Sequence, residues 1–242
     1  MSMHDHKSPT ALSSGEADGA ALFDDAFREA FARLVRYRRD IRAFRPDPVP
    51  QEVLESCMRL AHRAPSVGYS QPWRFVQVQD AQVMARVIDS FSRANAEALA
   101  ATEESRRGLY ARLKLEGLRE APVQMAVFCD EETDIGHGLG ARTMPETRRY
   151  SVVCAIHTLW LALRAHGIGL GWVSILYPED VKAALSAPES WRFIAWLCIG
   201  WPAVAPNSTP ELERAGWERR LPLDAVWLHH PPQKAQDKGR SG

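Results

Sequence analysis

Apolar side chains near the start of the chain recur every three or four positions, at Phe23, Phe27, Phe31, Leu34 and Val35. This spacing places side chains on one face of an α-helix. It therefore predicts a helix that carries the chain to Arg38. The arginines that follow would then lie at the end of a helix.

A proline-rich connection and a second helix are predicted next. Three prolines at positions 46, 48 and 50 favour extended backbone, and Pro50 can also open a helix because a residue of the first turn needs no N–H. The helix would end before Pro65. Its inward side would carry Val53, Leu54, Cys57, Met58 and Ala61.

Four short runs rich in β-branched, aromatic and other apolar residues predict strands. They are residues 73–79, residues 122–129, a run that ends at Ser174, and residues 193–201. The last is apolar on both faces, which indicates a central strand. The glycines at 167, 169 and 171 lack Gly-x-Gly-x-x-Gly spacing and follow a helix, so they favour a tight entry into the third strand over a Rossmann fold.

Further helical patterns lie between these runs. Residues 80–120 predict one or two charged helices that could cover a site, and Pro178 begins a short helix. Residues 150–166 predict a helix too apolar for the surface, which favours burial in a domain or dimer core. We expect its buried side to carry Val153, Ile156, His157, Trp160 and Leu163.

The ends of the chain lack a periodic apolar face. We expect residues 1–21 and 231–242 to be disordered, with a single α+β domain over residues 22–230. The stretch that leads to Arg219-Arg220-Leu221-Pro222 is interpreted as a strand or arm that leaves the core.

The composition of the chain limits the kinds of binding partner that we expect. The 242 residues include 30 Lys and Arg and 30 Asp and Glu, which are interspersed, so we expect small-molecule partners and neither nucleic acid nor a membrane. No apolar run approaches the roughly 20 residues of a membrane span, and no signal-peptide core opens the chain, which indicates a cytoplasmic protein. The 4 cysteines are well separated and predict core residues, and no His or Cys pattern predicts a metal site.

The most unusual stretch runs from Arg36 to Pro46, where five arginines surround one carboxylate, Asp40. Guanidinium groups match the oxygens of phosphate or carboxylate two at a time, so the cluster is a candidate anion site. The alternative is a solvated basic turn that offsets the negative end of the helix dipole. Asp40 itself could be a general base, an ion-pair partner of Arg38 or Arg42, or a turn cap.

Segments 38–42, 64–73, 171–174 and 219–222 together resemble the FMN-dependent nitroreductase family over about residues 22–230. More narrowly, Arg-Arg-Asp at 38–40, Ala-Pro-Ser-Val-Gly at 64–68, Lys-Leu-Glu-Gly at 114–117 and Gly-Trp-Val-Ser at 171–174 are similar to the 5,6-dimethylbenzimidazole synthases. Ordinary nitroreductases usually have Ser after the basic pair and a Pro-x-Glu-Gly type segment near the third strand. This chain has Asp40 and Ser174 instead. These two departures select the subfamily.

The resemblance implies an α+β, nitroreductase-like fold with a central, mostly antiparallel sheet flanked by helices, in an intertwined homodimer with FMN at the subunit interface. It implies a seat for the phosphate and ribityl chain formed by Arg38, Arg39, Arg42 and Arg220. It places Pro65 and Ser66 against the isoalloxazine ring, with Asn95 as a contact from the covering helix. On spacing alone, Ser66 could equally be a turn residue that satisfies its own backbone.

The implied reaction consumes the flavin. Reduced FMN reacts with O2 and is fragmented to 5,6-dimethylbenzimidazole and erythrose 4-phosphate, with Asp40 as general base and Ser174 near the flavin ring. Ser174 could instead be an ordinary strand-end serine. Reduced FMN could come from a separate NAD(P)H-dependent flavin reductase or be formed in place.

Two other functions remain open from the sequence. One is an NAD(P)H-dependent nitro or flavin reductase in which FMN is recycled. The other is a flavin-binding module without turnover.

Overall fold

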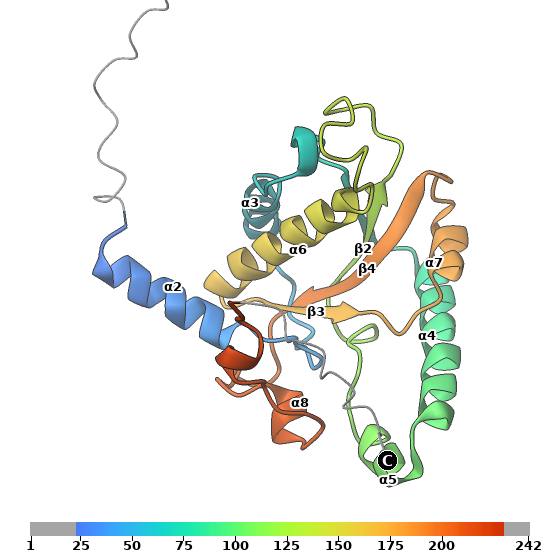
Figure 1. The fold of residues 1–242 in the computed structure, drawn as a ribbon. Helices are drawn as coiled ribbons and strands as arrows, with labels where there is room; N and C mark the ends of the chain where they lie inside the picture. The colour runs from blue at the N-terminus through green and yellow to red at the C-terminus, as the bar shows by residue number, and fades with distance from the viewer. Residues whose placement is uncertain (1–22, 230–242) are drawn as a thin grey trace, which may run out of the picture.

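The computed structural model describes residues 23–229 and is built on one four-stranded sheet with the order β1-β2-β4-β3 (Figure 1). Every neighbouring pair of strands is antiparallel. The four predicted strands are confirmed, and the interior place of the fourth agrees with its two apolar faces. The strands are β1 (Trp73–Val78), β2 (Val123–Asp130), β3 (Gly169–Val173) and β4 (Trp191–Gly200). The predicted disordered ends, residues 1–21 and 231–242, lie outside the described residues.

Helices cover both faces of the sheet. The predicted helices at both ends of the proline-rich connection, over 80–120, over 150–166 and after Pro178 are all present. Their bounds are α2 (Asp25–Tyr37), α3 (Gln51–Ala61), α4 (Ala81–Ala101), α5 (Glu104–Tyr110), α6 (Thr147–Ala165) and α7 (Pro178–Leu185). Shorter turns are η1 (Val67–Tyr69), α8 (Glu211–Arg214) and η2 (Leu223–Ala225).

The core has two halves, one on each side of the sheet. Along β2, Met125 and Val127 pack with α3 and α6, whereas Ala126 and Phe128 pack in the cluster of α4 and α7. Successive strand residues point to opposite faces, so a strand covered on both sides must be apolar throughout. Figure 1 shows α3 and α6 on one side of the sheet and α4 and α7 on the other.

The buried side of α6 differs from the prediction. Ile156 and Leu163 are buried as expected, but Val153 is 41% exposed and His157 is exposed. Cys154 is also exposed, so the prediction that all four cysteines fill the core is wrong for this one. Because α6 is apolar nearly all round, its sequence period does not select a face, and contact with the sheet does. The buried residues are Ser151, Val152, Ala155, Ile156, Leu159, Ala162 and Leu163.

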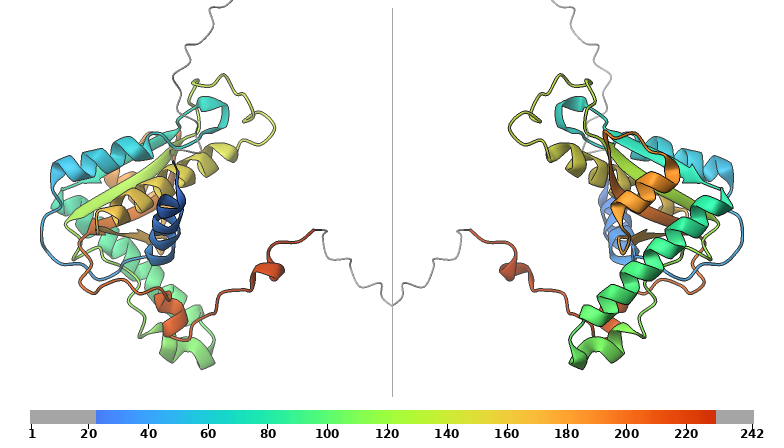
Figure 2. Two further views of the ribbon diagram at one scale, coloured as in Figure 1. Left: turned by 90° about the vertical axis from the view of Figure 1, so that its left-hand side faces the viewer. Right: turned by 90° about the vertical axis from the view of Figure 1, so that its right-hand side faces the viewer.

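Two apolar surfaces stay exposed in the part of the chain that the structure describes, residues 23–229. Helix α2 forms where the spacing predicts it, yet no residue of it is buried, and Phe27 and Phe31 are 48% and 49% exposed. The segment after α8 forms the predicted arm, without strand structure, and extends away from the body of the molecule (Figure 2). Its exposed apolar side chains are Leu221, Leu223, Val226, Trp227 and Leu228.

The connection after α2 lies along the free edge of β3. Ile41 N–H donates to Leu170 O at 3.1 Å, and Asp40 and Leu170 form a parallel bridge. A Cβ atom at Gly171 would collide with the Ile41 carbonyl oxygen, and one at Gly169 would lie 2.7 Å from Ile41 Cγ1. The glycines at 169 and 171 therefore allow two backbones to approach closely.

We expect Gly171→Ala to lower the free energy of unfolding by about 2 kcal/mol or more, because the new methyl group meets backbone that cannot swing aside. Urea denaturation followed by circular dichroism measures this. Gly108→Ala in α5 is the matched control, since its Cβ would meet nothing within 4 Å. Equal unfolding free energies for the two variants would contradict the close approach.

Candidate active site

Asp40 is held at the edge of the sheet by both of its carboxylate oxygens. Oδ1 accepts a hydrogen bond from Trp172 N–H of β3 at 2.8 Å, and Oδ2 forms an ion pair with Arg42 Nε at 3.1 Å. The side chain remains 32% exposed. The ion pair considered from the sequence is thus present, and the carboxylate also binds a backbone N–H of β3. Its orientation is fixed while one side stays accessible.

The surroundings of Asp40 also change its proton affinity. Burial raises the pKa of the Asp40 carboxyl, while Arg42, the Trp172 N–H and Arg38 act against that rise. Burial disfavours the charged form, and neighbouring cations and donors favour it. A carboxyl with a raised pKa exchanges protons closer to neutral pH than an exposed aspartate does, which suits acid–base chemistry.

Arg39 is engaged mainly with backbone. Its Nε donates to Asn207 O at 2.9 Å, and its terminal nitrogens donate to the carbonyls of Arg36, Arg38 and Ser208. Four of its five N–H donors are therefore occupied. Its guanidinium fastens the C-terminal segment to the end of α2.

Arg38 and Arg220 form the cationic part of the site. The Arg38 guanidinium lies over the Trp160 ring, 4.7 Å from its centre, and Trp160 Nε1 donates to Arg39 O at 3.1 Å. Burial lowers the pKa of Arg38; Asp40 opposes this, and the charge of Arg220 lowers it further. Burial and the charge of Arg38 lower the pKa of Arg39, and the charge of Arg220 lowers it further. The positive charge of Arg220 therefore acts on both Arg38 and Arg39.

Arg42 is largely buried, with 14% of its side chain exposed. In addition to its ion pair with Asp40, its Nη1 donates to Lys114 O at 3.0 Å. Neither the Lys114 carbonyl nor the Trp172 N–H could be found from the sequence, because backbone groups carry no sequence signal.

A cavity of about 470 Å³ opens beside this cluster. One wall is formed by residues 39–43, and the other by residues between 204 and 214. The second wall includes Glu211 and Arg214 and was not singled out from the sequence.

Ser174 lies directly after β3 and is exposed. It is two positions beyond Trp172, whose N–H binds Asp40, so about 7 Å of extended chain separates the two. Both predicted catalytic residues are thus associated with the same end of one edge strand. The position agrees equally with the alternative of a strand-end serine.

Pro65 and Ser66 lie elsewhere in the chain. Ser66 Oγ accepts from Gln71 N–H at 3.1 Å, which is the turn role considered from the sequence. The next residue, Val67, donates its N–H to Ser151 Oγ near the start of α6, whereas Arg38 stacks on Trp160. Positions 151 and 160 are separated by roughly 14 Å along the helix. One chain therefore keeps these two parts of the predicted flavin site apart.

Asn95 connects two helices of the covering region. Its Oδ1 accepts a hydrogen bond from Tyr110 Oη at 2.9 Å and so links α4 to the end of α5. The structure thus gives Asn95 a partner within the 80–120 region.

Within residues 23–229, no group of three or more His, Cys, Asp or Glu side chains could hold a metal ion. No helix in that range is long and apolar enough to cross a membrane.

The nitroreductase family matches residues 35–201, more than half of the chain. A protein of Rhodospirillum rubrum named 5,6-dimethylbenzimidazole synthase is 59% identical over 205 residues, which cover 85% of this chain and 97% of the relative. One of the same name from Rhodobacter capsulatus is 45% identical over 202 residues, 84% of this chain and 97% of the relative.

The fold also matches solved structures. A crystal structure of oxidized iodotyrosine deiodinase bound to FMN and 3-iodo-L-tyrosine aligns with a TM-score of 0.63 and 24% identity, over 74% of this chain and 94% of that one. The antiparallel sheet flanked by helices, the family match and the length of the similarity agree with one another, and the chain belongs to the nitroreductase family.

Proposed function

We propose that this chain catalyses the oxygen-dependent fragmentation of reduced FMN to 5,6-dimethylbenzimidazole and erythrose 4-phosphate. The observation that carries the proposal is the Asp40 carboxylate, fixed between Arg42 and the Trp172 N–H beside a cationic cluster. The names of relatives that are 59% and 45% identical support it.

The residues of the chain fit an anionic flavin. Arg38 and Arg220 repel each other, so a phosphate between them would relieve that repulsion and accept charge-assisted hydrogen bonds. Arg39 and Arg42 contribute positive charge while they hold the C-terminal segment and Asp40. The bound FMN of the deiodinase is compatible with a flavin site on this fold.

Asp40 is placed to move a proton. FMN, when bound, supplies the ring and ribityl chain that O2 breaks down. A carboxylate with a raised pKa near the sugar can accept a proton from a ribityl carbon, and Arg42 keeps it oriented throughout. The Ser174 hydroxyl, which can donate or accept a hydrogen bond, acts on the ring side of the same site.

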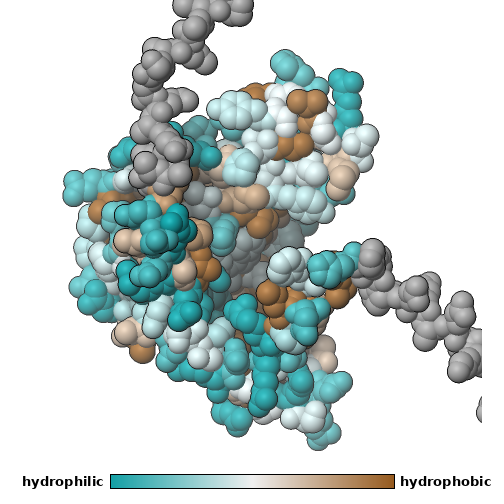
Figure 3. All heavy atoms as spheres, turned by 60° about the vertical axis from the view of Figure 1, so that its left-hand side comes forward, coloured by the Kyte–Doolittle hydropathy of each residue, from teal (hydrophilic) through white to brown (hydrophobic). Residues whose placement is uncertain are grey.

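A second copy of the chain completes the site in this proposal. Proteins of this family are typically dimers that bind FMN. Pairing would bring Pro65 and Ser66 of one copy to the arginines of the other, which a single chain keeps apart. It would also cover the apolar side chains of α2 and the C-terminal arm, which border a hollowed face in Figure 3. Burial of such surface is the usual driving force of obligate dimers.

The electrons come, in this proposal, from a separate NAD(P)H-dependent flavin reductase that delivers reduced FMN.

The test of the proposed function is to mix the purified chain with chemically reduced FMN in air and analyse the products by liquid chromatography and mass spectrometry. We expect one 5,6-dimethylbenzimidazole for each FMN lost. Oxidation of the flavin without its loss would favour the recycling reductase, and stoichiometric binding with no product would favour a binding module.

Asp40→Asn should reduce product formation about 100-fold or more, because the amide keeps an oxygen for the Trp172 N–H but cannot act as a base. FMN affinity should change little. Asp47→Asn, at an exposed ion pair with Arg45, is the matched control. Product formation at the parental rate by Asp40→Asn would exclude the role given to Asp40.

The parental rate should also fall on acidification. Only the ionised carboxylate accepts a proton, so the rate is lost as the pH drops through the pKa of Asp40. Because burial raises that pKa, the acid limb should lie above the value of about 4 that is typical of an exposed aspartate.

Arg220→Ala should weaken FMN binding roughly tenfold or more, since it removes a charge-assisted donor from the phosphate. Fluorescence titration of FMN measures the dissociation constant. Arg219→Ala changes the neighbouring residue and is the control. If both variants bind FMN as the parent does, Arg220 does not belong to the phosphate site.

A further inference from the structure

The segment Lys114–Glu120, between α5 and β2, contacts the chain around Asp40 at three points. Arg42 Nη1 donates to Lys114 O at 3.0 Å, and Phe44 N–H donates to Glu120 Oε2 at 3.3 Å. Gly117 lies against the Phe44 ring so closely that a Cβ there would be 2.6 Å from Phe44 Cδ2. The segment includes the Lys-Leu-Glu-Gly motif, to which the proposed reaction gives no role.

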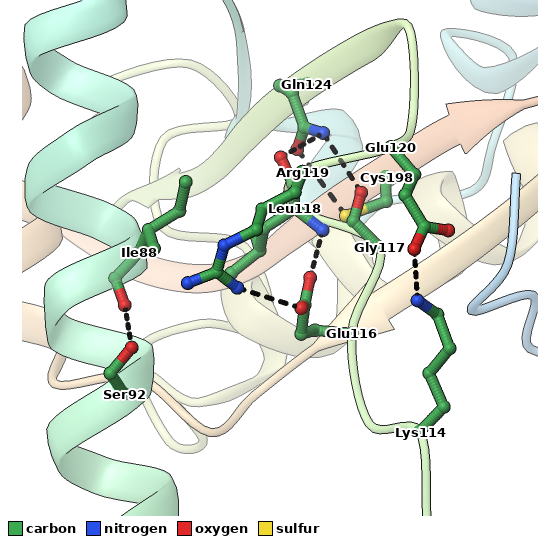
Figure 4. A network of polar contacts seen from close by, with 10 residues as sticks. All are labelled: Ile88, Ser92, Lys114, Glu116, Gly117, Leu118, Arg119, Glu120, Gln124 and Cys198. Atoms are coloured by element: carbon green, nitrogen blue, oxygen red, sulfur yellow. Dashed lines mark hydrogen bonds and ion pairs between the residues drawn. The ribbon is translucent and has the colours of Figure 1, made fainter. Parts of the chain in front are cut away.

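Buried hydrogen bonds hold this segment in place (Figure 4). Gln124 of β2 is 6% exposed, and its Oε1 accepts from Trp196 Nε1 at 2.7 Å. Its Nε2 donates to the carbonyls of Gly117, Leu118 and Ala121, at 3.3, 3.1 and 3.1 Å. At the outer side, Lys114 and Glu120 form an ion pair. Gln124 therefore fixes the segment to the sheet, and the ion pair between Lys114 and Glu120 joins its two ends.

We propose that Lys114–Glu120 is a positioning element of the active site, in which the Lys114 carbonyl holds Arg42 and Arg42 holds Asp40. This inference rests on the proposed function only where it predicts a change in product formation. The predicted change in the pKa of Asp40 does not depend on that function. Glu120 is a positioning residue in this scheme, because it joins Lys114 to the backbone of Phe44 and touches no reacting atom.

The charges around Asp40 predict the direction of the effect. Arg42 and Arg38 face it from its own segment, the Trp172 N–H faces it from β3, and Glu211 and Arg214 line the same cavity. From β4, the Cys198 thiol stays neutral because burial raises its pKa. Arg42 is the strongest of the groups that lower the pKa of Asp40. Looser placement of Arg42 would therefore raise that pKa.

A purely structural role for Glu120 would give a different result. Its ion pair with Lys114 is about two-fifths exposed on both sides, and such pairs contribute about 1 kcal/mol or less to stability. Loss of the negative charge alone would lower the pKa of Asp40. A rise in that pKa with an almost unchanged unfolding free energy is therefore the result expected from an altered position of Arg42.

The experiment compares the parent with Glu120→Ala and Glu120→Gln. Glu55→Ala, which removes an exposed ion pair with Arg59 on α3, is the control. The pKa of Asp40 is followed by carboxyl-carbon NMR, with the signal assigned by its loss in Asp40→Asn, and product formation is measured across the same pH range. For Glu120→Ala we expect the pKa of Asp40 and the acid limb to rise by about half a unit or more. Glu120→Gln, which keeps an acceptor for Phe44 N–H, should restore most of the difference.

The two readouts separate the two proposals. An unchanged or lowered pKa of Asp40 in Glu120→Ala overturns the positioning role, whatever the activity. A raised pKa in a protein that makes no product supports the positioning role and overturns the proposed function. A raised pKa in Glu55→Ala would also overturn the inference, because the effect would not be specific to the segment.

Discussion

The free edge of β3 is the constraint on which the site depends. An edge strand presents unpaired N–H and C=O groups that must find partners. Here the backbone of Ile41 satisfies Leu170 O, and the carboxylate of Asp40 satisfies Trp172 N–H. The side chain of Asp40 thus takes the place of a neighbouring strand for the Trp172 N–H. Its carboxylate is therefore fixed at the edge of the sheet. The small residues of β3 are necessary for this approach.

Because the segment around Asp40 packs along β3, its arginines have different partners. Arg39 is occupied by carbonyls of the C-terminal segment, and Arg42 is turned inward to Asp40 and Lys114. Arg38 is stacked on Trp160, and the charges of Asp40 and Arg220 both act on it. An acid within a basic cluster would weaken anion binding if it were close to the anion. In this structure the carboxylate of Asp40 is bound by Arg42 and by the Trp172 N–H, so part of its charge is offset.

A single chain presents this arrangement with apolar side chains exposed beside it. The stripe of α2, the exposed face of α6 and the C-terminal arm all carry apolar residues that stay exposed in residues 23–229. Pro65 and Ser66 are separated from the arginines by much of the length of α6. The proposed dimer explains both features with one contact, because it covers the surfaces and joins the two halves of the flavin site.

The sequence by itself determined the elements and the family. Helical and strand periods predicted the strands and the main helices, because these patterns depend on residues close in sequence. The motifs at 38–42, 64–73 and 171–174 indicated the nitroreductase family, which the comparison confirms. Only the tertiary structure decided that α6 buries Val152 and not Val153, and that Arg39 and Arg42 have different partners. These outcomes depend on backbone groups and faces brought together from distant parts of the chain, and no local pattern encodes them.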